Sequence, residues 1–171
     1  TGKYANRIGL AGALNHTSQN GLAPAEVTLA EVCRSRGYAT AIYGKWHLGH
    51  QPQFLPTQQG FDHFEGLPYS NDNGPLHATV RGIPPLPWYV QDEVVAHDPD
   101  QSLFTQRLTD RAIEFITTKK AQPFLVYLPH IMPHVPIFAS KAYQGKSVGG
   151  RYGDVIEELD ANIGRLLAAI E

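Results

Sequence analysis

The sequence contains a single cysteine, Cys33, among its 171 residues, so no disulfide can form within the chain. It has no run rich in lysine and arginine, no repeat and no low-complexity tract, and its formal net charge is -2. Binding to nucleic acid through a basic face therefore has little support. No apolar stretch approaches the roughly 20 residues that span a bilayer, and the first ten residues lack the apolar core of a signal peptide.

The residues that are present describe a globular unit or a piece of a larger one, because 42% are hydrophobic and 18% are charged. Helix-like and strand-like segments alternate, which predicts an α/β fold with parallel strands. The expected helices lie at about 28–36, 99–119 and 151–170, and the expected strands at 38–49 and 123–129. The region 50–95 is rich in glycine and proline and is predicted to be irregular surface. Such a long loop is usually functional or ordered by something outside it.

Capping residues and apolar spacing define the expected helices. Thr28 and Glu31 have the spacing of a capping box, Gly37 provides a stop, and Leu29, Val32 and Cys33 are expected to share the buried face.

The second and third helices are expected to be amphipathic. In the second, Asp98 is the expected N-cap, and the apolar face consists of Phe104, Leu108, Ala112, Phe115 and Ile116. In the last, Val155, Leu159, Ile163, Leu166, Leu167 and Ile170 are spaced to face a packing partner.

The first candidate site is the segment GKWHLG at 44–49, which ends the strand YATAIY. Ligands of open α/β sheets bind beyond the carboxyl ends of the strands. In extended backbone Lys45 and His47 would share one face, with Trp46 on the other. A fixed cation beside an imidazole that titrates near neutral pH suits an anionic substrate. By spacing alone, a solvated lysine and a hydrogen-bonded loop histidine explain the pattern equally well.

The second candidate is PHIMPHVP at 129–136, which follows the strand PFLVYLP. His130 and His134 are four residues apart, but Pro133 and Pro136 argue against the helix that a metalloprotease pair requires. Either histidine can simply end a strand. Backbone fixed by proline also holds a catalytic side chain in place.

The third candidate is SNDNGP at 70–75, where Asp72 and Asn73 offer oxygen ligands of the kind that calcium or magnesium takes. The favoured interpretation is a turn, because no other carboxylates cluster nearby in the sequence. No metal ligand is therefore assigned in this chain.

Several of these segments together resemble the type I sulfatases, of the arylsulfatase A-like, formylglycine-dependent branch. TGKYANRIGL resembles the segment after the nucleophile motif of that family, and LAEVCRSRGYATAIYGKWHLG resembles its next helix, strand and Lys-x-His motif. LPTQQGFDHFEGLPYSNDNGP is similar to the following loop, PFLVYLPHIMPHVP to the strand that ends in an active-site histidine, and YGDVIEELDANIGRLLAAI to a later helix. The resemblance is colinear over nearly all 171 residues.

The resemblance implies part of an alkaline-phosphatase-like three-layer sandwich with a mostly parallel central sheet, incomplete in this chain. It implies a sulfuric ester hydrolase that acts through a formylglycine nucleophile with calcium. Lys45 matches the lysine that binds the sulfate group. His47 matches the histidine that contacts formylglycine and acts as the base expelling sulfate from the covalent intermediate, and His134 the histidine that contacts the sulfate and the leaving-group oxygen. His130 matches no catalytic position and is at most a supporting residue.

The chain also departs from the family. The Cys-x-Pro/Ala-x-Arg motif that yields formylglycine is absent from the chain. CRSRG at 33–37 does not match it, because its spacing differs and Cys33 is interpreted as a small core residue. The motif is therefore expected to precede Thr1. The calcium ligands are likewise expected outside this chain. Residues 1–171 are thus expected to be a single internal segment of a catalytic domain, marginally stable and inactive alone.

Three functions remain open from the residues and the resemblance. The first is hydrolysis of a sulfate ester, either a small molecule or a sulfated glycan. The second is hydrolysis of a phosphate or phosphonate ester by the same wider superfamily, and the third is binding of sulfated glycans by a non-catalytic relative. The resemblance points to a periplasmic, secreted or lysosomal setting, and the residues themselves leave the compartment undecided.

Overall fold

A single open sheet of five strands organises the protein, and the computed structural model describes all residues from 1 to 171. The strand order is β4-β3-β2-β1-β5. β1 pairs in parallel with both β2 and β5, whereas β2 with β3 and β3 with β4 are antiparallel pairs. The strands are β1 (Ala39–Lys45), β2 (His63–Leu67), β3 (Pro87–Val90), β4 (Glu93–His97) and β5 (Phe124–Tyr127). The α-helices are α1 (Leu29–Ser35), α2 (Phe104–Lys119) and α3 (Gly150–Ile170).

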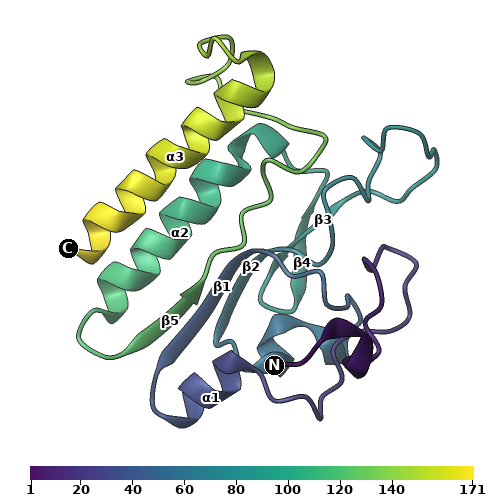
Figure 1. Ribbon diagram of the computed structural model, residues 1–171, viewed down its shortest axis with the longest axis vertical. Helices are drawn as coiled ribbons and strands as arrows, with labels where there is room; N and C mark the ends of the chain where they lie inside the picture. The colour runs from purple at the N-terminus through teal and green to yellow at the C-terminus, as the bar shows by residue number, and fades with distance from the viewer.

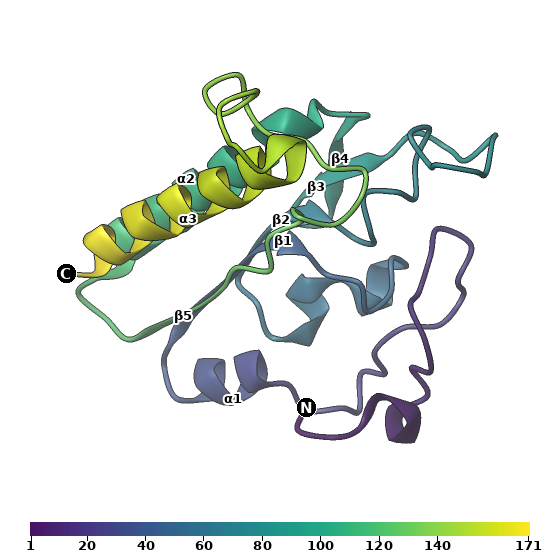
Figure 2. The same ribbon diagram turned by 45° about the horizontal axis from the view of Figure 1, so that its top comes forward.

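The helices and the sheet form three layers. The helices α2 and α3 lie side by side on one face of the sheet, and α1 lies with the N-terminal segment on the opposite face (Figure 1, Figure 2). Short 3-10 turns connect these elements at Ala5–Ile8, Pro52–Phe54, Pro56–Gln59 and Gln101–Leu103. None of the α-helices combines the length and the hydrophobicity that a membrane-spanning helix requires. The architecture agrees with the α/β sandwich that the sequence predicts.

β1 is buried on both faces because its side chains alternate between two cores. Ala41 and Tyr43 join a cluster of 15 buried residues beneath α2 and α3. Ile42 instead joins a cluster of eight buried residues on the α1 face, which includes Trp46 just past the strand. Lys45, the last residue of the strand, is only half-buried. The first polar side chain after a run of buried ones therefore stands at the carboxyl end of a central strand, where the sequence places it.

α1 begins as predicted but buries a different face. Thr28 accepts from the Glu31 N–H while Glu31 accepts from the Thr28 N–H, which completes the capping box. Ala30 is buried, whereas Leu29 is 63% and Val32 48% exposed, so the predicted buried face of this helix is wrong. A Cβ on Gly60 would lie 2.4 Å from the backbone nitrogen of Glu31, so α1 approaches the chain too closely for a large side chain at the contact.

α2 has the predicted apolar face but not the predicted cap. The five expected residues are all buried: Phe104, Leu108, Ala112, Phe115 and Ile116. Asp98 adopts a left-handed backbone (φ 47) and accepts from the Leu86 N–H, so it does not cap the helix. Asp100 instead caps the 3-10 turn that leads into α2, by accepting from the Ser102 N–H.

The region 50–95 contains more regular structure than the sequence predicts. β2 and β3 lie within it, and β4 begins there. β2 extends the parallel part of the sheet, and β3 and β4 form an antiparallel edge. The prediction of irregular surface is therefore wrong for these strands and correct for the turns between them. The carboxyl end of β2 becomes a third strand end beside those of β1 and β5.

α3 and β5 present surface that nothing in the chain covers. Val155 of α3 is buried, but Ile163, Leu167 and Ile170 are 40%, 56% and 57% exposed. β5 forms one edge of the sheet and is only partly buried, whereas the sequence predicts a strand covered on both faces. β5 therefore leaves one sheet edge unpaired, and α3 leaves an apolar helix face exposed.

Candidate functional site

The segment from Lys45 to His47 is fixed between the ends of the neighbouring strands by backbone hydrogen bonds. The Lys45 N–H donates to the Pro129 carbonyl beyond β5 at 3.0 Å. The His47 N–H donates to the Pro68 carbonyl beyond β2, also at 3.0 Å. Gly44 permits this close approach, because a Cβ there would lie 2.1 Å from the Pro129 carbonyl oxygen. The segments after three parallel strands therefore meet at this point.

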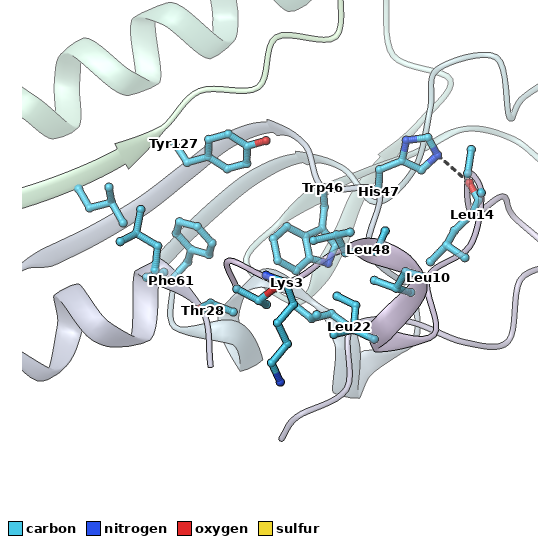
Figure 3. Close-up of a pocket in the computed structure, with 18 of the residues that line it drawn as sticks. Lys3, Leu10, Leu14, Leu22, Thr28, Trp46, His47, Leu48, Phe61 and Tyr127 are labelled. Atoms are coloured by element: carbon cyan, nitrogen blue, oxygen red, sulfur yellow. Dashed lines mark hydrogen bonds between the residues drawn. The ribbon is translucent and has the colours of Figure 1, made fainter. Parts of the chain in front are cut away.

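His47 does not share an extended backbone with Lys45. β1 ends at Lys45, and His47 has a φ of 63°, in the left-handed region. Its ring Nε2 lies 2.7 Å from the Leu14 carbonyl oxygen (Figure 3). Because a carbonyl oxygen only accepts, Nε2 carries the hydrogen, and Nδ1 of the neutral ring is left free to take a proton. The extended backbone from which Lys45 and His47 were expected to share one face is therefore not present at His47.

The surroundings of His47 favour its neutral form. Burial lowers the pKa of His47, the Leu14 carbonyl opposes that lowering, and the nearby charges of Lys45 and His134 lower the pKa further. The Asp72 carboxylate raises it. Burial also lowers the pKa of Lys45, against the charge of Asp72. The structure thus places Lys45, His134 and the Asp72 carboxylate within electrostatic reach of the His47 ring.

His134 lies in the turn after β5 and contacts a serine that the sequence analysis missed. Its Nδ1 is 2.6 Å from the Val135 carbonyl oxygen and therefore carries a hydrogen, which leaves Nε2 as the acceptor. The buried Ser70 hydroxyl lies 3.2 Å from both ring nitrogens. Ser70 follows the end of β2, so recognising that strand within region 50–95 would have singled it out.

Asp72 and Asn73 form the predicted turn, in which the Asn73 N–H donates to the Ser70 carbonyl at 3.0 Å. No group of three or more His, Cys, Asp or Glu side chains in the chain is placed to hold a metal ion. Asn73 Nδ2 donates to Asp72 Oδ1 at 3.1 Å. Asn73 Oδ1 accepts from the backbone N–H of His16 at 3.3 Å and lies 3.1 Å from its ring Nδ1. The turn thus ties the carboxylate near Lys45 to a loop at the N-terminal end of the chain.

His130 is half-buried, and both of its ring nitrogens are buried without a hydrogen-bond partner. Burial lowers its pKa to about 4, so the ring is neutral at physiological pH. Burial is the only cause of this lowering, and no charged residue contributes to it. The expectation that His130 is at most a supporting residue stays a prediction.

An apolar pocket of about 650 Å³ borders the site on the α1 face of the sheet (Figure 3). Hydrophobic residues make up 14 of the 19 residues that line it, among them Trp46 and Phe61. His47 lies at its border, but Lys45 and His134 do not line it. An anionic group is better placed at the polar strand ends than in this pocket, because burial without a charge partner is costly.

The family model described as Sulfatase matches residues 1–171. Arylsulfatase A of Bos taurus is 37% identical over 188 residues, covering 99% of this chain and 37% of the relative. N-acetylgalactosamine-6-sulfatase of Mus musculus is 33% identical, covering 88% of this chain and 31% of the relative. The chain thus spans well under half the length of the curated relatives it matches.

Solved structures show the same fold. A protein described under the metabolism of multiple glycosaminoglycans by Bacteroides thetaiotaomicron superposes with a TM-score of 0.79 at 24% identity, covering 99% of this chain and 47% of that one. A sulfatase from Pseudoalteromonas sp. gives a TM-score of 0.74 at 24% identity, covering 85% of this chain and 34% of that one.

Proposed function

Because the chain belongs to the sulfatase family, we propose that the protein of which it forms part hydrolyses a sulfate ester at the site of Lys45, His47 and His134. The observation that carries the proposal is the convergence of a cation, a neutral imidazole and a His–Ser pair at the ends of three parallel strands. Fixed positive charge stabilises the negative charge that accumulates on a transferring sulfuryl group.

The roles follow from the atoms that are free. Lys45 binds a sulfate oxygen through its ammonium group. His47 has Nε2 committed to the Leu14 carbonyl, so it takes a proton at Nδ1. His134, held by the Val135 carbonyl and Ser70, faces the leaving-group oxygen and gives it a proton from Nε2 when the ring is protonated.

Two further components expected for this family do not fit the residues of this chain. Cys33 lies on α1, outside the site, and no group of acidic or histidine side chains is placed to hold calcium. Formylglycine and calcium are therefore proposed for the rest of the protein. The roles above concern only proton transfer and anion binding by the chain's own side chains.

The proposed substrate is a sulfate ester, either a small molecule or a sulfated glycan. Names of relatives point in this direction, since one similar protein is an N-acetylgalactosamine-6-sulfatase and one solved structure contains D-glucosamine-2-N,6-O-disulfate as its substrate. Residues 1–171 alone are proposed to be inactive, because the edge of β5 and one face of α3 are uncovered. Turnover of an aryl sulfate by the purified 171-residue chain would contradict that proposal.

The test compares 4-nitrophenyl sulfate with 4-nitrophenyl phosphate as substrates of the complete protein. We expect faster turnover of the sulfate ester and a loss of about 100-fold or more in kcat/KM for Lys45→Ala and His134→Ala. Lys141→Ala, which removes an exposed lysine, is the matched control. Faster turnover of the phosphate ester would replace the proposal with phosphoester hydrolysis. Binding of sulfated glycans without turnover would replace it with a binding function.

A further inference from the structure

The turn that contains Asp72 and Asn73 has polar contacts that its backbone does not require. A single hydrogen bond from the Asn73 N–H to the Ser70 carbonyl closes the turn. The side chains make additional hydrogen bonds, because the Asn73 amide donates to Asp72 and accepts from His16. None of the roles proposed above uses these contacts.

The contacts with His16 fix the loop that holds the His47 ring. Leu14, whose carbonyl accepts from His47 Nε2, is two residues before His16 in a segment without helix or strand. Asn73 Oδ1 accepts from the backbone of His16 and, as it can only accept, requires a hydrogen on the His16 ring Nδ1. Farther along the loop, Gln51 Nε2 donates to the Ser18 carbonyl at 2.6 Å. Asn73 is thus the side-chain anchor nearest the carbonyl that sets the His47 tautomer.

Asp72 supplies the negative charge in the same place. The charges that act on His47 are Lys45, His134 and Asp72, and the one that acts on Lys45 is Asp72. In both cases the Asp72 carboxylate raises the pKa, against the effect of burial. The carboxylate is itself oriented by the Asn73 amide at 3.1 Å. Charge and loop position are therefore coupled through two adjacent side chains.

We propose that Asp72 and Asn73 are positioning residues for the Lys45–His47 pair. Asn73 holds the loop that carries the Leu14 carbonyl, and Asp72, held in turn by the Asn73 amide, is the counter-charge that favours the charged form of Lys45. The inference rests on the proposed function of the same site. It also gives the turn a role in the protein that is neither metal binding nor chain reversal alone.

The first test measures the pH dependence of kcat/KM for an aryl sulfate with the complete protein and its Asp72→Asn variant. Loss of the carboxylate lowers the pKa of both His47 and Lys45, so both limbs of the profile move to lower pH. Asn73→Ala frees the loop and leaves the Asp72 carboxylate in place without its amide donor, so kcat falls about 10-fold or more and the limb that belongs to His47 moves further than the limb that belongs to Lys45. The matched controls are Asp160→Asn on the exposed side of α3 and Asn6→Ala at an exposed asparagine, and both leave the profile unchanged.

The second test separates this inference from the proposed function. The pKa of His47 is followed by NMR of the histidine-labelled complete protein, with and without Asp72→Asn, and needs no turnover. A lower pKa of His47 in the variant supports the inference even if the protein does not hydrolyse a sulfate ester. An unchanged pKa of His47, or profile limbs that stay in place in an active enzyme, overturns it.

Discussion

His130 makes the stability of the protein depend on pH, and replacing it with phenylalanine should remove most of that dependence. Both ring nitrogens are buried without partners, and burial lowers the pKa to about 4. The ring has a pKa of about 6.5 in an unfolded chain. Between these two values the unfolded chain binds more protons than the folded protein does. Stability is therefore fully present above the unfolded pKa and is lost as the pH falls towards the folded pKa.

The size of the effect follows from the difference between the two pKa values. Each unit corresponds to about 1.4 kcal/mol, so protonation of His130 costs about 3 kcal/mol over the whole range and about 2 kcal/mol between pH 7 and pH 5. At pH 7 His130→Phe is expected to be neutral or slightly stabilising, because it removes two buried polar atoms that have no partner.

The assay is urea unfolding of the complete protein at pH 7 and pH 5, followed by the fluorescence of Trp46 and Trp88. The wild-type protein should lose about 2 kcal/mol more between the two pH values than His130→Phe does. His97→Phe, at an exposed histidine of β4, is the control and should behave as the wild type. Equal losses for the wild type and His130→Phe would refute the reasoning, because His130 would then titrate alike in the folded and unfolded states.

Two further substitutions test how the sheet is held to its helices. Glu65 is buried and accepts from Arg107 at 2.6 Å and from Arg111 at 2.9 Å, and both arginines are partly exposed. Glu65→Gln should therefore lower the free energy of unfolding by about 1–3 kcal/mol, measured by urea unfolding. An unchanged unfolding midpoint would show that the ion pairs contribute nothing. Thr28→Ala removes the hydroxyl that accepts from the Glu31 N–H and should cost about 1 kcal/mol, whereas Thr28→Ser should retain most of the stability. Equal stability of these two variants would contradict the capping argument.

The sequence predicted the positions of Lys45 and His134 because they follow apolar runs that form parallel strands. The helix α2 was predicted for a similar reason, since its apolar spacing matches the buried face. The capping box of Thr28 and Glu31 was also predicted correctly, because its two residues are near each other in the sequence. These features depend on periodicity and on short-range contacts, both of which are visible in the sequence.

Other features depend on contacts that no local pattern contains. The left-handed backbone of His47 and its bond to the Leu14 carbonyl arise from a loop 33 residues earlier in the chain. Ser70 pairs with a histidine 64 residues away, and β2 is too short and glycine-containing to show a clear alternation. The predicted buried face of α1 was wrong, because Gly60 lies so close to the helix at Ala30 and Glu31 that a large side chain has no room at this contact.

The measurement that tests the central claim most directly is a crystal structure of the complete protein with inorganic sulfate. The account predicts a sulfate ion within about 3 Å of both Lys45 Nζ and a ring nitrogen of His134, with His47 Nδ1 facing it. Sulfate bound elsewhere, for example at Arg107 and Arg111, with none beside Lys45, would contradict the assignment of this site.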